Sequence, residues 1–201
     1  MKLLACPKCH QQLHLENKTL KCENNHCYDI SKRGYINLLL NPDKATNNPG
    51  DSKESLVARK AYLNKGYYDP ILNQVITCID EFKHQDDLSI LDLGCGEGYY
   101  TQGLKKHFEN SDIYGLDISK IAIDMATRYR KDVTWLVGNS KNIPILDHSL
   151  DFICALFTVV NQDELKRALK EDGYIVHVTA NNQHLICLLY TSPSPRDRQK
   201  S

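Results

Sequence analysis

The chain has 201 residues, 41% of them hydrophobic and 25% charged, with 25 basic and 25 acidic side chains. These values predict an ordinary soluble protein with one full domain and a small additional module. No apolar run approaches the roughly 18 residues that cross a bilayer, and the N-terminus lacks the apolar segment of a secretory signal. The sequence therefore excludes a membrane protein and favours the cytoplasm.

Charge is unevenly distributed along the chain. Residues 1–66 carry eleven Lys and Arg against six Asp and Glu, whereas residues 67–188 carry eleven against eighteen. A basic N-terminal part that precedes an acidic part favours a polyanionic partner. An ordinary solvated surface explains the pattern equally well.

Four of the eight cysteines lie within the first 27 residues. Without an export signal, this density favours a metal over disulfides. Cys6 and Cys9 are separated by two residues, and Cys22 and His26 by three, a spacing typical of tetrahedral zinc. Residues 13–16 and 19–22 alternate in polarity around a tight turn, so a hairpin would bring both ligand pairs together.

The fourth zinc ligand stays open, because Cys27 could replace His26 and His10 lies close by. The alternative to zinc is a redox dithiol made by Cys6 and Cys9. It lacks the βαβ context of such motifs and leaves Cys22 unexplained. Zinc is therefore the prediction, and folding of so short a segment should depend on the metal.

The segment that follows joins this module to the rest of the chain. Residues 41–51, rich in Asn, Pro and Asp, predict an irregular linker. A helix follows, capped by Ser52 and ending at Gly66. Tyr67 and Tyr68 come next, and their pattern alone favours packing over binding.

From residue 89 the chain alternates between strand and helix. Repeated β-α-β order predicts a Rossmann-like α/β fold, a parallel sheet with helices on both faces and ligands at the strand ends. Strands are expected at 89–94, 112–119, 133–139, 150–157 and 174–180, and helices from about residue 99 and at 121–129 and 162–169.

A glycine-rich turn, GCGEG, follows the first of these strands. Dinucleotide sites require G-x-G-x-x-G, but here Gly98 comes one residue early and Tyr99 takes the place of the third glycine. The turn resembles motif I of the S-adenosylmethionine-dependent methyltransferases. Gly94 and Gly96 would let main chain approach the amino-acid part of the cofactor, where a side chain would clash.

The next two strand ends support this resemblance. Asp117 ends the second strand, where a carboxylate accepts both ribose hydroxyls of an adenosine. The third strand ends at Gly138-Asn139, where adenine commonly lies in that superfamily. Glycines that served only the turn would not explain all three strand ends.

The whole chain up to about residue 187 resembles the 23S ribosomal RNA (guanine-N1)-methyltransferase family, with its N-terminal zinc-binding module. The resemblance rests on CPKCH, CENNH, YDISKRGYINLL, PGDSKESLVARKAYLNKGYYDPI, LDLGCGEGYYT, YGLDISKIAI and NNQHL. It implies zinc at Cys6, Cys9, Cys22 and His26. It also implies cofactor contacts from Tyr68, Tyr100, Thr101 and His184, so that Tyr68 would close over the cofactor.

The same resemblance implies the reaction, methyl transfer from S-adenosylmethionine to N1 of a guanine in a hairpin of 23S rRNA. The zinc module would grip the hairpin by shape and phosphate contacts, with the guanine splayed into the pocket. No proton acceptor is assigned. Asp163 and Glu164 follow the fourth strand, but acids at that position are more often ordinary helix-start charges.

The C-terminal residues break the pattern. Residues 188–201 read as a Ser/Pro/Arg tail that resembles translated adapter sequence, so we expect a C-terminally truncated methyltransferase sheet. The predicted division is a zinc module at 1–40, a linker and helix at 41–70, an incomplete methyltransferase domain at 71–187 and a non-native tail at 188–201.

Two other functions remain open from the sequence. One is a small-molecule methyltransferase that uses its zinc module only for assembly, and the other is a non-catalytic, zinc-dependent RNA-binding protein. Self-association as a homodimer also stays open.

Overall fold

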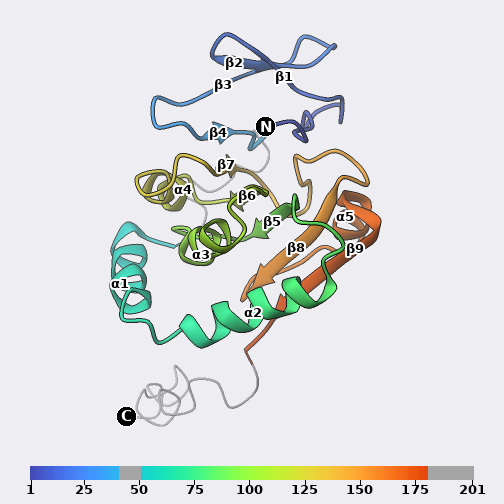
Figure 1. The fold of residues 1–201 in the computed structure, drawn as a ribbon. Coiled ribbons are helices and arrows are strands. Elements are labelled where there is room, and N and C mark those ends of the chain that lie inside the picture. Colours follow the sequence, from blue (N-terminus) through green and yellow to red (C-terminus); the bar gives the residue numbers. More distant parts are fainter. Residues whose placement is uncertain (41–50, 181–201) are drawn as a thin grey trace, which may run out of the picture.

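The computed structural model describes residues 1–40 and 51–180 and contains a small sheet stacked on a larger one (Figure 1). Most of the predicted linker, His184 and the predicted tail at 188–201 lie outside the described residues. Among the described helices, none is long and apolar enough to cross a membrane.

The small sheet is antiparallel and consists of β1 (His14–Glu16), β2 (Thr19–Lys21) and β3 (Cys27–Asp29). Leu15 of β1 pairs with Leu20 of β2 across a turn in which Asn17 adopts a left-handed φ of 59°. This is the hairpin that the polarity pattern predicts. The third strand was not predicted.

The larger sheet is parallel throughout, as the repeated β-α-β order predicts. Its strands, in spatial order, are β4 (Ile36–Asn37), β7 (Thr134–Val137), β6 (Asp112–Asp117), β5 (Ser89–Leu93), β8 (Leu150–Leu156) and β9 (Leu169–Val178). β4 lies within the range that the sequence analysis gave to the zinc module. The two parts are therefore joined through one sheet.

Five helices are found among the described residues: α1 (Lys53–Leu63), α2 (Asp69–Phe82), α3 (Tyr99–His107), α4 (Lys120–Ala126) and α5 (Gln162–Ala168). Ser52 caps α1 as predicted, and its side chain accepts a hydrogen bond from Ser55 N–H at 3.2 Å. The helix ends three residues before Gly66. α2 was not predicted: Pro70 lies in its first turn, where the missing N–H costs nothing.

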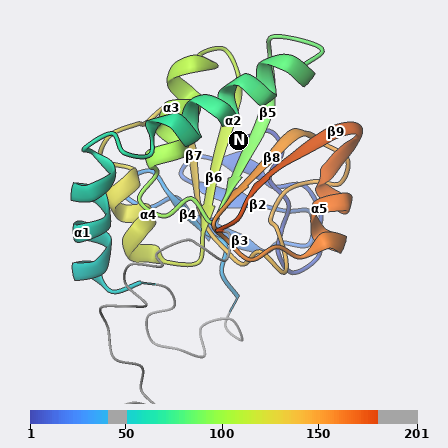
Figure 2. The same cartoon turned by 90° about the horizontal axis from the view of Figure 1, so that it is seen from below.

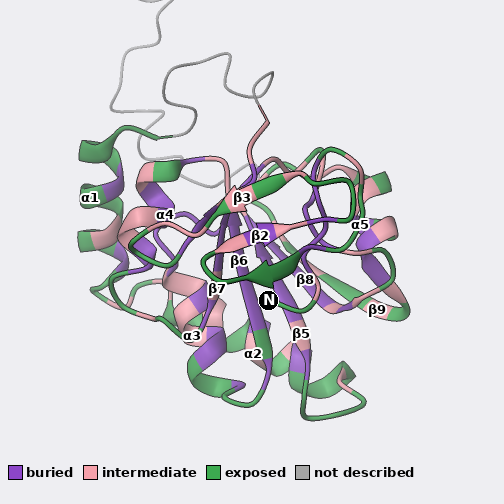
Figure 3. Cartoon of the chain, turned by 90° about the horizontal axis from the view of Figure 1, so that it is seen from above, coloured by how far each residue is buried: buried purple, intermediate pink, exposed green. Residues whose placement is uncertain are grey.

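Helices lie on both faces of the large sheet, as predicted, but the two faces are covered differently. Helices α2, α3 and α4 cover one face (Figure 2), and their apolar side chains pack around Ile90, Ile113 and Trp135. The zinc module and α5 cover the other face (Figure 3). Leu4 and Leu20, both almost completely buried, pack there in one cluster with Leu91 of the sheet.

The zinc module is hydrogen-bonded to the loop that follows β7. Leu4 forms a β-bridge with Ile145, and Leu146 N–H donates to Leu3 O at 2.9 Å. The Asn142 side chain donates to Pro7 O, inside the Cys6–Cys9 loop, at 2.8 Å. The metal-binding loop is therefore fixed against the methyltransferase sheet.

Candidate active site and metal centre

Three thiols and one imidazole meet at the N-terminal module. The ligand atoms of Cys6, Cys9, Cys22 and His26 all lie within 4.8 Å of one another. Cys9 Sγ lies 3.6 Å from Cys22 Sγ, and His26 Nδ1 lies 3.4 Å from Cys6 Sγ and 3.5 Å from Cys22 Sγ. Tetrahedral zinc with ordinary Zn–S and Zn–N bonds places its ligands about 3.5 to 3.8 Å apart, so the set fits zinc.

Of the three candidates for the fourth zinc ligand, His26 is the one that lies in the cluster. Cys27 is exposed, and its thiol donates to Asn25 O at 3.4 Å. His10 is not part of the cluster. The Tyr28 hydroxyl lies 3.3 Å from Cys6 Sγ, where it can donate to a thiolate and orient it.

The glycine turn after β5 is built from left-handed residues. Gly94, Gly96 and Gly98 have φ values of 73°, 56° and 86°, which favour glycine. A Cβ on Gly98 would lie 2.6 Å from the Trp135 ring, so this glycine permits close packing between the helix start and β7. A Cβ on Gly96 would meet nothing within 4 Å, so the turn leaves bare main chain beside open space.

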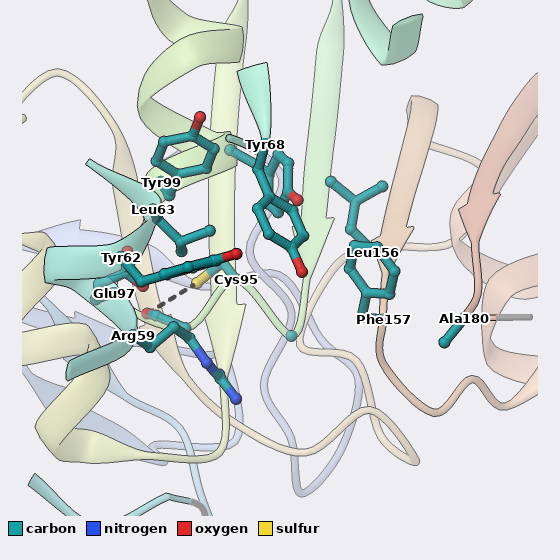
Figure 4. Close-up of a pocket in the computed structure, with 13 residues that line it drawn as sticks. Arg59, Tyr62, Leu63, Tyr68, Cys95, Glu97, Tyr99, Leu156, Phe157 and Ala180 are labelled. Carbon is teal, nitrogen blue, oxygen red and sulfur yellow. Dashed lines mark hydrogen bonds between the residues drawn. The ribbon is translucent and has the colours of Figure 1, made fainter. Parts of the chain in front are cut away.

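A cavity of ≈ 440 Å³ opens at this turn (Figure 4). Tyr68 and Tyr100 line it together with Gly94 and Gly96, all four of them predicted site residues. The sequence analysis missed the rest of the lining: Arg59, Tyr62, Leu63, Cys95, Glu97, Tyr99, Leu156, Phe157 and Ala180. Cys95 and Glu97 lie within the quoted glycine motif and Tyr99 follows it, but the others come from distant segments that no local pattern connects.

Asp117 fixes the turn from the neighbouring strand. Its carboxylate accepts from Gly96 N–H at 2.9 Å and from Ser119 N–H at 2.7 Å. An ionised carboxylate has about four acceptor positions, so two remain for hydroxyls of a ligand. Burial raises the pKa of Asp117 above its usual range, although the two backbone hydrogen bonds oppose this shift.

Two more buried carboxyl groups lie near the turn. Burial raises the pKa of Asp92 to about 7, and Thr101 opposes this by donating to it at 2.5 Å. Burial also raises the pKa of Glu97. Arg59 opposes the effect of burial on the pKa of both Glu97 and Asp117, because a positive charge favours the carboxylate form.

The remaining predicted residues have different surroundings. Thr101 is fully buried and holds Asp92 rather than lining the cavity. The Tyr100 hydroxyl is buried without a hydrogen-bond partner in the described part of the chain, so a bound ligand could satisfy it. Asn139 lies past β7, outside the cavity lining, and accepts from Lys141 N–H.

Glu164 and Asp163 do not reach the cavity. The Glu164 carboxylate pairs with Arg167 at 2.9 Å and accepts from Ile143 N–H at 2.7 Å. Asp163 is exposed in the first turn of α5, where Asn161 caps the helix. Both acids therefore have the structural role that the sequence analysis favoured.

S-adenosylmethionine fits this site on three observations. The bare main chain at Gly96 leaves room for the amino-acid part, Asp117 has acceptor positions for the ribose, and the Glu97 carboxyl group in the cavity lining suits a cationic group. The fold and the site define a class I S-adenosylmethionine-dependent methyltransferase. Residues 90–173 match the family described as "Methyltransferase domain", and residues 4–45 match "RlmA, N-terminal", a zinc ribbon.

Curated relatives narrow this class. The 23S rRNA (guanine(748)-N(1))-methyltransferase of Streptomyces fradiae is 29% identical over 92% of this chain and 66% of its own length. The putative 23S rRNA (guanine-N(1)-)-methyltransferase YxjB of Bacillus subtilis (strain 168) is 31% identical over 96% of this chain and 71% of its own. The chain belongs to the 23S rRNA (guanine-N1)-methyltransferase family, and it spans about two thirds of the length of these relatives.

Solved structures support the fold alone. The plantazolicin methyltransferase BpumL in complex with SAH is 21% identical, with a TM-score of 0.57 over 72% of this chain and 60% of that one. A putative S-adenosyl-L-methionine-dependent methyltransferase from Methanococcus maripaludis is 22% identical, with a TM-score of 0.52 over 71% of this chain and 73% of that one.

The open space at Gly96 yields a first prediction. Gly96→Ala should weaken binding of S-adenosylhomocysteine at least tenfold, because the new methyl group projects into the ligand's space. Gly34→Ala is the matched control, since Gly34 also has a left-handed φ, 95°, and open surroundings, but lies outside the cavity lining. Calorimetric titration should show equal binding by Gly34→Ala and unsubstituted protein, and equal weakening in both variants would contradict the assignment.

The buried Asp92 yields a second prediction. Its pKa rises from 3.8 to about 7 on folding, so the folded state holds the proton more tightly. The contribution of Asp92 to the free energy of unfolding should therefore be largest below pH 4 and should fall as pH rises through about 7. Asp92→Asn should flatten this slope in urea titrations between pH 4.5 and 8. The control is Asp87→Asn, an exposed residue, and a slope unchanged in Asp92→Asn would refute the shift.

Proposed function

We propose that the protein transfers a methyl group from S-adenosylmethionine to N1 of a guanine in a hairpin of 23S rRNA. The observation that carries this proposal is that both parts of the chain align with rRNA methyltransferases, over 92% and 96% of its length. By contrast, the demethylmenaquinone methyltransferase of Thermotoga maritima is 34% identical over only 41% of the chain. A small-molecule function is therefore the weaker candidate.

In this proposal the cavity serves to align two reactants. When bound, S-adenosylmethionine supplies an electrophilic methyl group on its sulfonium sulfur. Main chain at Gly94 and Gly96 would hold the amino-acid part, and the Asp117 carboxylate would accept from the ribose hydroxyls. Tyr68 and Tyr100 would close the cavity, exclude water and fix the distance to the acceptor nitrogen. The methyl group would replace the proton on guanine N1, and that proton would leave to water.

The proposal gives a separate role to each of the other predicted cofactor residues, Thr101, Asn139 and His184. Thr101 acts indirectly, by holding the Asp92 carboxyl group behind the turn. Asn139 follows β7 and would lie beside the adenine, next to the ribose site at Asp117. His184, outside the described residues, is retained as a cofactor contact on the resemblance alone.

We further propose that Cys6, Cys9, Cys22 and His26 hold Zn²⁺ in a closed structural site. The module presents exposed basic side chains for the RNA phosphates, which suits recognition of a folded hairpin by shape. These side chains are Lys2, Lys8, Lys18, Lys32 and Arg33. Such a protein would work in the cytoplasm, where it meets the rRNA. Self-association as a homodimer stays a prediction.

The direct test uses full-length protein, because the relatives are longer than this chain. Incubation with labelled S-adenosylmethionine and 23S rRNA lacking its modification should give one labelled guanine, which blocks reverse transcription at N1. Labelling of small-molecule extracts without any label in the rRNA would instead favour the second candidate. Cofactor binding with no transfer to either would favour the non-catalytic RNA-binding alternative.

The zinc assignment yields a further prediction. Cys9→Ser should lose bound zinc, lower the melting temperature and weaken binding to the rRNA hairpin, because metal binding and folding of the module are coupled. The matched control is Cys27→Ser, which changes an exposed thiol that is not part of the ligand cluster. Metal analysis, thermal melts and hairpin titrations at two salt concentrations measure these effects. Full zinc content in Cys9→Ser would contradict the assignment.

A further inference from the structure

The strand order reverses between β5 and β8. From β5 the chain runs outward through β6 to β7, whereas from β8 it runs to β9 on the other side. Ligands bind in the crevice at such a point, outside the carboxyl ends of the strands. Gly94 follows β5 and forms one wall of this crevice, and Phe157 follows β8 and forms the other. Both residues line the cavity. The two walls touch, because a Cβ on Gly94 would lie 2.4 Å from the Thr158 hydroxyl.

Phe157 has an unusual backbone for a large side chain. Its φ is 56°, in the left-handed region that bulky residues rarely adopt. Its N–H donates to Val178 O at 2.9 Å, so β9 holds this conformation in place. Residues 152–156 are all buried, yet the Phe157 side chain is 41% exposed. The strained turn therefore moves the Phe157 ring out of the core and into the cavity wall. Such backbone strain is often found at functional sites, which points to a functional role for this ring.

The cavity wall around Phe157 is apolar and aromatic. Tyr68 meets the Phe157 ring edge to face, with ring centroids 6.1 Å apart and an interplanar angle of 77°. Leu156 and Ala180 line the same side. The charged lining residues, Arg59 and Glu97, lie on the opposite side, beyond Tyr68 (Figure 4). A charged cofactor and a flat aromatic base therefore have separate walls to bind to.

We infer that Phe157 is a stacking platform that positions the target guanine in the mouth of the cavity, with Tyr68 supporting its ring. This inference rests on the proposed function. An extruded base is commonly held by stacking on aromatic side chains, which also fixes the plane of its ring. Methyl transfer to N1 needs this orientation, because N1 lies in the ring plane and must face the donor methyl group. No charged group is needed on this wall.

The test compares three substitutions in full-length, zinc-loaded protein. Phe157→Leu keeps an apolar side chain and the same left-handed backbone but removes the aromatic face. It should lower kcat/KM for the unmodified rRNA hairpin roughly 5- to 150-fold, the range for loss of one base–aromatic stack. Phe157→Tyr should restore activity to within about threefold of the unsubstituted protein. Val159→Ala is the matched control, since Val159 is 82% exposed and lies outside the cavity lining.

Two readouts separate stacking from a merely structural role. Binding of S-adenosylhomocysteine and the melting temperature should be the same in Phe157→Leu and Phe157→Tyr. With 2-aminopurine in place of the target guanine, fluorescence should be quenched on binding to the Tyr variant and stay brighter with the Leu variant. Equal kcat/KM in the Leu and Tyr variants would overturn the inference and leave the proposed function intact. Absence of rRNA methylation by the unsubstituted protein would overturn both.

Discussion

The site depends on one hydrogen bond between neighbouring strand ends, from Gly96 N–H to the Asp117 carboxylate at 2.9 Å. The turn can form because three glycines accept left-handed φ values, and the carboxylate, which is not among the residues that line the cavity, fixes its main chain. The same carboxylate keeps free acceptor positions for a ligand. The conformation of the turn follows from this contact, and the cofactor and acceptor positions that we propose depend on it.

The zinc module, although small, also has a structural role in the methyltransferase sheet. It supplies much of the apolar cover for one face of the methyltransferase sheet, and Leu4 and Leu20 belong to the same core as Leu91. Asn142 connects the Cys6–Cys9 loop to the segment after β7. Loss of the metal would therefore disturb the sheet as well as the RNA-binding surface that we propose, which distinguishes this arrangement from a freely tethered module.

Local patterns predicted the parts of the structure that local chemistry determines. Cysteine spacing gave the metal cluster, and the glycine turn and Asp117 followed from strand ends in a parallel sheet. Contacts between distant residues were not predictable in this way. Helix α2, with Pro70 in its first turn, was not predicted, two-residue β4 carries no periodicity, and Phe157 looks like one more core residue of β8. Only the backbone angle and exposure of Phe157 reveal that its ring lies in the cavity.

A crystal structure of the full-length protein with S-adenosylhomocysteine is the most direct measurement of the central claim. The account predicts both ribose hydroxyls within hydrogen-bonding distance of the Asp117 carboxylate, and the homocysteine part against main chain at Gly94 and Gly96. A ligand bound elsewhere, or a ribose whose hydroxyls point away from Asp117, would contradict it.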